Sequence, residues 1–323
     1  MSVLVLGGYG AVGGRVVRLL RAQGWDIVVA GRDGTLADRV VDLADANSYR
    51  SALFGVRVVV NCSGREDPRL AEMAAARGIP FVDISASTAY VRALESIHGP
   101  VLMGVGIAPG LTGMLAREAF AGTAGPVDIL IGLGAGEKHG VAATEWTYGL
   151  LGKSFVDPDG TTVRNFTRRT AFELPDRVGY RPASAVRADF ADQHRLTATL
   201  GVDVRTYIRM DTGSATLGLR ALTWMPALAR LVPSRMPGGQ RWVTMARATD
   251  GTRVWATGSE QSDATAVVAA WSVSGLLGER FDLAEPTWLH DITSIGEIAP
   301  ALAEAGISVE SDPADRFGPR PFA

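Results

Sequence analysis

Cysteine is almost absent from the sequence: Cys62 is the only one among 323 residues. One cysteine cannot form a disulfide within the chain, and this favours a reducing cellular compartment. No apolar run reaches the roughly 18 residues of a membrane-spanning helix, and no secretion signal precedes the first apolar strand. We therefore expect a cytoplasmic protein that does not associate with membranes.

An excess of charge of either sign is also missing. The 32 Lys and Arg residues nearly balance the 34 Asp and Glu residues, so nothing favours a nucleic-acid partner. The 47% of hydrophobic residues exclude a disordered chain. A length of 323 residues suits two units, and we predict a first domain over 1–124, a second over 125–262 and a C-terminal segment over 263–323.

Glycine, in contrast, is concentrated at the start of the chain. Val3 to Val17 read as an apolar strand, a glycine cluster and the first turns of an amphipathic helix. Gly8, Gly10 and Gly13 match the pattern G-x-G-x-x-G, which brings backbone N–H groups against a pyrophosphate at the positive end of a helix. The predicted contacts to a dinucleotide here are Gly7, Gly8, Tyr9, Gly10, Ala11 and Val12, with Tyr9 packing on the cofactor.

The end of the second strand predicts which dinucleotide is bound. The strand Asp26 to Ala30 is followed by Gly31 and Arg32, whereas NAD-specific sites place an acidic side chain at this point. Gly31 leaves room for a 2′-phosphate, and the guanidinium group of Arg32 offers it a planar pair of donors. The alternative is that Arg32 is solvated and Asp33 binds the ribose of NAD. We favour NADP.

The pattern then alternates short apolar runs with helices, as in a doubly wound parallel sheet. Asp42, near the end of the strand Val40 to Leu43, is expected to meet the adenine or its ribose. The strand Val56 to Asn61 runs into a turn that we place under the cofactor, at the carboxyl edge of the sheet. This turn consists of Cys62, Ser63 and Gly64. Nothing near Cys62 in the sequence would activate it as a nucleophile, and we predict no metal ligands.

Five motifs carry a resemblance to a known family. They are GGYGAVG at the start, AGR after the second strand, VVNCSG, FVDIS and GIAPGL, and they lie within residues 1–120. In this order and spacing the chain resembles the saccharopine dehydrogenase-like superfamily of NAD(P)-dependent oxidoreductases. The resemblance implies a Rossmann domain, a second α+β domain for substrate binding and dimerisation, and a chain end that returns to the first domain. Residues 254–258 and 264–277 are similar to the family's late strand and helix.

Titratable residues gather in the segment from Gly136 to Lys153. The candidate catalytic residues are Lys138, His139, Glu145 and Tyr148. A helix over Val141 to Leu151 would aim its first N–H groups at a substrate carboxylate, and His139 or Lys138 would donate the proton that accompanies hydride transfer. The alternative is a polar loop followed by a solvated helix face.

Residues 212–249 contain arginines but no acidic residue. Apolar residues recur at helical spacing from Leu217 to Leu231, interrupted by Pro226. Three interpretations are open: a lid over an anionic substrate, a subunit interface or a helix at a membrane surface. Ser311 to Ala323, rich in proline, is expected to be a loose tail or an arm onto a neighbouring subunit.

Together these patterns predict an NADPH-dependent oxidoreductase that acts on a small, anionic molecule and forms a homodimer. Reduction of a C=N bond in a carboxylate-bearing substrate follows from the family resemblance and the arginines. One alternative is reduction of a C=C bond in an acyl substrate, with the apolar stripe from Leu217 to Leu231 around the acyl chain. Another is a redox sensor that binds NADP without turnover.

Overall fold

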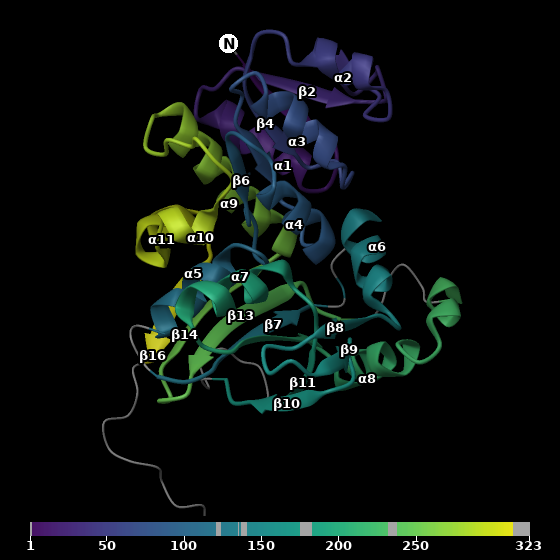
Figure 1. The fold of residues 1–323 in the computed structure, drawn as a ribbon, viewed down its shortest axis with the longest axis vertical. Helices are drawn as coiled ribbons and strands as arrows, with labels where there is room; N and C mark the ends of the chain where they lie inside the picture. Colours follow the sequence, from purple (N-terminus) through teal and green to yellow (C-terminus); the bar gives the residue numbers. More distant parts are fainter. Residues whose placement is uncertain are drawn as a thin grey trace, which may run out of the picture.

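Two sheets, one above the other, organise the chain (Figure 1). The computed structural model describes residues 2–120, 124–134, 136, 141–174, 183–231 and 238–312, and for 141–145, 183, 230 and 231 it describes the backbone alone. Of the predicted catalytic residues, Lys138 and His139 and the side chain of Glu145 therefore lie outside the described part.

The first sheet is entirely parallel, with the order β15-β6-β5-β4-β1-β2-β3. Its strands are β1 (Ser2–Leu6), β2 (Ile27–Gly31), β3 (Arg39–Val40), β4 (Val56–Asn61), β5 (Phe81–Asp83), β6 (Val101–Met103) and β15 (Thr287–Trp288). The strand order reverses direction at β1 and β4, as in a doubly wound Rossmann fold. The predicted fold class is confirmed.

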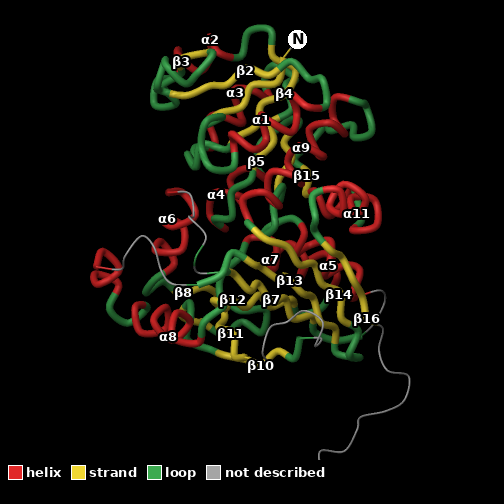
Figure 2. The backbone as a smooth tube through the Cα atoms, turned by 180° about the vertical axis from the view of Figure 1, so that it is seen from behind, coloured by secondary structure: helices red, strands yellow, loops and turns green. Residues whose placement is uncertain are grey.

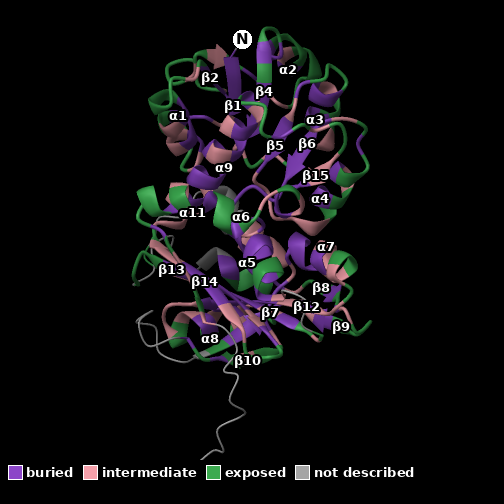
Figure 3. Cartoon of the chain, turned by 90° about the vertical axis from the view of Figure 1, so that its left-hand side faces the viewer, coloured by how far each residue is buried: buried purple, intermediate pink, exposed green. Residues whose placement is uncertain are grey.

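Alternate residues of β1 pack against helices on opposite faces of this sheet, because successive side chains of a strand point to opposite sides. Val3 and Val5 belong to the core formed with α1 (Gly13–Ala22) and α9 (Gln261–Leu277). Leu4 and Leu6 belong to the core on the other face. The helices there are α2 (Ala46–Ala52), α3 (Pro68–Ala75) and α4 (Thr88–Glu95). Figure 3 shows the buried strands between these two layers.

The second sheet is mixed, with the order β10-β11-β12-β7-β13-β14-β16. Its strands are β7 (Val127–Leu133), β10 (Arg169–Phe172), β11 (Ala183–Arg187), β12 (Val204–Met210), β13 (Arg241–Ala248), β14 (Arg253–Ser259) and β16 (Ser308–Asp312). Within the described part of this sheet, β7 and β12 pair in parallel and the other neighbouring strands pair antiparallel. α5 (Leu111–Phe120) and α7 (Ala191–Leu200) lie between the two sheets, as Figure 2 shows from behind.

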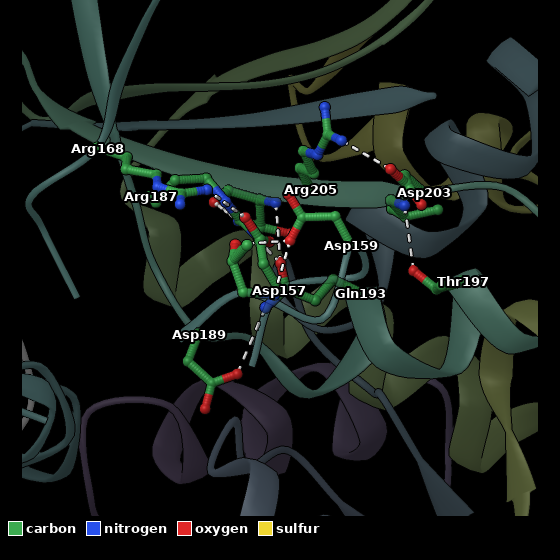
Figure 4. Close-up of polar contacts among 12 residues, drawn as sticks. Asp157, Asp159, Arg168, Arg187, Asp189, Gln193, Thr197, Asp203 and Arg205 are labelled. Carbon is green, nitrogen blue, oxygen red and sulfur yellow. Dashed lines mark hydrogen bonds and ion pairs between the residues drawn. The ribbon is translucent and has the colours of Figure 1, made fainter. Parts of the chain in front are cut away.

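A buried ion pair ties one side of the second sheet together. Arg187 of β11 is 1% exposed and pairs with Asp157, which follows the short strand β8 (Ser154–Val156). The same guanidinium donates to Gln193 Oε1 of α7 at 3.0 Å and to the carbonyl oxygen of Thr206 in β12 (Figure 4). β8 itself pairs with β9 (Thr162–Arg164). Because its guanidinium has acceptors in α7, in β12 and after β8, Arg187 links β11 to these three parts of the chain.

The end of the described chain contributes to both sheets. β15 extends the first sheet beside β6, and after α10 (Leu289–Ile292) and α11 (Ile295–Glu304) the strand β16 pairs with β14 of the second sheet. The resemblance implied a return to the first domain, and β15 lies in the first sheet. Ser311, where we expected a loose tail to begin, is part of β16, and residues 313–323 lie outside the described part. The domain limits 1–124, 125–262 and 263–323 stay predictions.

The predicted apolar stripe from Leu217 to Leu231 is not one helix. α8 (Gly213–Leu222) ends before Pro226, and a 3-10 helix, η2 (Pro226–Leu231), follows. Leu219 is buried, whereas Leu217 and Trp224 are exposed, so some apolar side chains of this segment point into the core and others into solvent.

None of the described helices has both the length and the apolar character that a membrane-spanning helix requires.

Candidate functional site

The glycine loop has the close backbone packing that its motif demands. A Cβ atom on Gly13 would lie 2.2 Å from the carbonyl oxygen of Gly7, and one on Gly8 would lie 3.0 Å from that of Val5. Helix α1 begins at Gly13, with no acidic side chain in its first turn and no side-chain hydrogen bond from its N-cap Val12. The N-terminal N–H groups of α1 therefore present an environment that fits a pyrophosphate.

Two cavities meet at this loop. The larger has a volume of about 1590 Å³ and the smaller about 540 Å³, and both are lined by Tyr9, Gly10 and the turn from Cys62 to Gly64. Ala11 and Val12 line the larger cavity, whereas Gly7, Arg32 and Asp42 line the smaller. Of the predicted cofactor residues only Gly8 lines neither, because it is buried against β1 and Val29.

The smaller cavity has the residues of an adenosine site. Its wall combines Gly31 and Arg32, after β2, with Asp42 near β3. Asp33, the rival candidate for a ribose contact, does not line it. Instead the Asp33 carboxylate accepts hydrogen bonds from the hydroxyl and the backbone N–H of Thr35, at 2.7 and 2.9 Å. These bonds lower the pKa of Asp33 and hold its side chain toward its own loop.

A buried polar network fixes the turn between the two cavities. Asn61, the last residue of β4, donates to Asp83 Oδ2 at 2.8 Å and accepts the hydroxyl hydrogen of Ser63 at 2.7 Å. The hydroxyl of Tyr90 donates to the same Asp83 oxygen at 2.9 Å. Burial raises the pKa of Asp83. The network fixes the orientation of the Ser63 side chain, so the turn from Cys62 to Gly64 keeps its shape at the carboxyl edge of the sheet.

The surroundings of Cys62 disfavour the thiolate form of its side chain. Burial raises the pKa of its thiol to about 12, and the charge of Asp83 adds to the effect. Because the thiolate is the reactive form, a thiol that stays protonated at neutral pH does not support covalent catalysis. Cys62 contributes to the wall between the cavities instead.

Glu66 is a cavity residue that the sequence analysis did not identify. It lines the larger cavity two residues beyond the Cys62 to Gly64 turn. Burial raises the pKa of Glu66, and the charge of Asp83 raises it further, while hydrogen bonds from Ser87 at the N-terminus of α4 act in the opposite direction. The signal was its position just after the strand end, where ligands bind in this architecture. A carboxyl group with a raised pKa beside a cavity is a candidate proton donor.

The far wall of the larger cavity is built by the second sheet and its neighbours. Its large apolar side chains come from β7, α6 (Val141–Leu150), the start of α7, β12 and α8. They are Ile131, Leu133, Trp146, Phe190, Ile208, Met210, Leu219 and Leu222. None of the described lining residues of β7, α6, α7, β12 and α8 carries a charge. Tyr148 also lines this wall, so it is the one predicted catalytic residue whose side chain the structure places there.

Charged residues of this cavity lie on the side of the first sheet. Arg15 of α1 pairs with Glu260 at 2.8 Å and with Asp263, which joins the start of α1 to the start of α9. Glu260 has a φ of 58°, a conformation that costs energy for a residue with a side chain.

The histidines His98, His194 and His290 line neither cavity. Burial lowers the pKa of His290 to about 4, so its ring is neutral.

Comparison with known proteins identifies the fold. No family model and no curated protein matches the sequence. Saccharopine dehydrogenase (L-Glu forming) from Saccharomyces cerevisiae is similar in structure, with a TM-score of 0.59 and 12% identity over 96% of this chain and 99% of that chain. DAP dehydrogenase from C. glutamicum, in complex with DAP, has a TM-score of 0.45 at 14% identity, over 90% of this chain and 93% of that chain.

The first of these likenesses extends over nearly the whole of both chains. Its identity is low, so what it shows is a shared fold alone. The Rossmann domain and the second α+β domain that the resemblance implied are both present. What the site binds and does must be argued from its own residues.

Proposed function

We propose that the protein is an NADP(H)-dependent oxidoreductase. The observation that carries this proposal is the junction of two cavities at one glycine loop, the smaller beside Arg32 and the larger between the first sheet and the second. The smaller fits the adenosine half of a dinucleotide, and the larger has room for the nicotinamide half together with a substrate. Bound there, the nicotinamide would supply or accept the hydride.

Arg32 decides the preference for NADP over NAD. The predicted result of Arg32→Ala is a Kd for NADPH that is about 10- to 100-fold weaker, because one charge-assisted contact to the 2′-phosphate contributes roughly 1.5–3 kcal/mol. The Kd for NADH is expected to change by less than two-fold. Calorimetric titration of both nucleotides measures this. Arg39, whose guanidinium donates to the carbonyl oxygen of Ala52, is not a cavity residue and supplies the control Arg39→Ala. Equal losses for NADH and NADPH would contradict the assignment.

The substrate carries a reducible double bond, and two classes compete. A C=N bond in a carboxylate-bearing molecule needs a cation to pair with the carboxylate, since a buried carboxylate without a partner is costly. The described lining of the larger cavity offers cations on the side of the first sheet, Arg15 and Arg18, and apolar side chains on the wall formed by β7, β12 and α8. The apolar wall also suits the other class, a C=C bond conjugated to the carbonyl group of an acyl substrate whose hydrocarbon chain lies along these elements.

A cavity-filling variant separates the two classes. Gly218 of α8 lines the larger cavity, and a Cβ atom there would have no atom within 4 Å, so Gly218→Leu extends into open space. We expect at least a ten-fold lower kcat/KM for enoyl thioesters with long chains and a change below two-fold for those with four carbons, since each displaced CH₂ contributes about 0.8 kcal/mol. Gly213→Leu is the control, because Gly213 has equal space on α8 but does not line the cavity.

The measurement is NADPH oxidation against enoyl thioesters of increasing length and against pairs of amines with keto acids. Oxidation by the amine pairs alone, unaffected by Gly218→Leu, would establish the carboxylate-bearing imine as the substrate. Tight binding of NADPH with no oxidation by any compound would favour the redox sensor.

We also propose that the protein forms a homodimer. The exposed apolar side chains of Leu217, Trp224 and Leu228 provide a surface for the contact between the subunits.

A further inference from the structure

Tyr9 reaches from the glycine loop to the end of β2. Its hydroxyl oxygen accepts hydrogen bonds from two consecutive backbone N–H groups, those of Arg32 at 3.1 Å and Asp33 at 3.3 Å. The side chain is 41% exposed and lines both cavities. The partly exposed side chain of Tyr9 therefore engages two backbone N–H groups at the mouth of the proposed adenosine site.

Gly31 makes this position possible. A Cβ atom on Gly31 would lie 2.3 Å from Cε1 of Tyr9 and 2.6 Å from its hydroxyl oxygen. Any other residue at this point would push the ring away from the two N–H groups. The absence of a side chain at Gly31, which we first attributed to space for a 2′-phosphate, is thus used by Tyr9 in this structure.

The two N–H groups and Arg32 form an anion site. Consecutive backbone N–H groups in a turn make a concave donor surface for an anion, and the guanidinium of Arg32 adds charge beside it. We propose that the Tyr9 side chain competes with the 2′-phosphate of NADP: its phenolic oxygen takes the acceptor position of the phosphate, which displaces it when NADP binds. This inference rests on the proposed function and assigns a role within the same site.

The 2′-phosphate can displace the phenol for a physical reason. A doubly charged phosphate forms stronger hydrogen bonds with the two N–H groups than a neutral phenol does, so it replaces the phenol at a net gain. The 2′-hydroxyl of NAD is neutral like the phenol and gains nothing by the exchange, so NAD leaves Tyr9 in place. Tyr9 thus lowers the affinity for NADP alone, and the preference for NADP, which comes from Arg32 and the two N–H groups, is smaller than it would be without the phenol.

The test uses fragments that occupy the adenosine half alone, 2′,5′-ADP and 5′-AMP, titrated calorimetrically into the full chain. Tyr9→Phe keeps the ring and removes the oxygen, leaving the N–H groups to water. We expect 2′,5′-ADP to bind about five-fold more tightly to Tyr9→Phe than to the unmodified protein, as one neutral hydrogen bond no longer has to be broken. The affinity for 5′-AMP is expected to change by less than two-fold.

Tyr207→Phe is the matched control, because Tyr207 of β12 lines neither cavity, and it should leave both affinities unchanged. Thermal unfolding of each variant verifies that the fold is kept. Unchanged or weaker binding of 2′,5′-ADP to Tyr9→Phe would overturn the role of Tyr9 while leaving the NADP assignment intact. If the unmodified protein bound 2′,5′-ADP no more tightly than 5′-AMP, the NADP assignment and this inference would both fail.

Discussion

Glu66→Gln is expected to lower kcat for NADPH oxidation by roughly 100-fold, the lower end of what a positioned general acid contributes. Glu66 lines the larger cavity, and its raised pKa keeps part of the population protonated at a higher pH than an ordinary glutamate allows. The amide of glutamine has the same shape and still accepts a hydrogen bond from Ser87, but it cannot deliver a proton. The assay uses the compound that the unmodified enzyme reduces fastest.

The role of Glu66 as a proton donor also predicts how kcat changes with pH. A carboxyl group donates a proton only in its acid form, so kcat of the unmodified enzyme should fall as the pH rises through the raised pKa of Glu66. Glu66→Gln should be slow at every pH and lack this fall. Glu72→Gln is the control, since Glu72 is exposed on α3 and lines neither cavity. A fall with pH that persists in Glu66→Gln would assign the proton to another group.

Gly13→Ala is expected to abolish nucleotide binding. The added methyl group would lie 2.2 Å from the carbonyl oxygen of Gly7, so α1 must move away from the loop. Crowding of this kind costs about 1–3 kcal/mol of unfolding free energy. Each N–H contact to the pyrophosphate that is lost costs roughly 1.5–3 kcal/mol of binding, so loss of two weakens the Kd by at least 100-fold. Calorimetry and thermal unfolding report the two effects separately.

Gly14→Ala provides the comparison within the same turn of α1. Its methyl group would lie 3.7 Å from the nearest atom, the carbonyl oxygen of Gly8, which is an ordinary contact distance. We expect this variant to keep both its unfolding temperature and its affinity for NADPH. Normal NADPH binding by Gly13→Ala would mean that the loop does not hold the pyrophosphate as we describe.

The sequence predicts the first sheet well because its signals are local. A short apolar run bounded by turn residues locates β4 with the bounds that the structure has, Val56–Asn61. The glycine spacing predicts the strand, loop and helix around Gly13 for the same reason. Each of these features depends on residues within one or two turns of one another.

The remaining features depend on pairings between distant segments, which no local pattern encodes. β16 pairs with β14 across some fifty residues, and the predicted loose tail therefore begins as a strand. The apolar wall of the larger cavity combines β7, α6, β12 and α8. Glu66 and the contact of Tyr9 with the end of β2 likewise emerge only in three dimensions. Lys138 and His139, chosen because polar residues cluster around them, lie outside the described part.

Titration of the purified full-length chain with NADPH and with NADH tests the central claim most directly. The account predicts one binding site, a Kd for NADPH in the micromolar range or below, and an affinity for NADH at least ten-fold weaker. Absence of heat and of any thermal shift with either nucleotide at millimolar concentration would contradict it, because the glycine loop would then hold no dinucleotide.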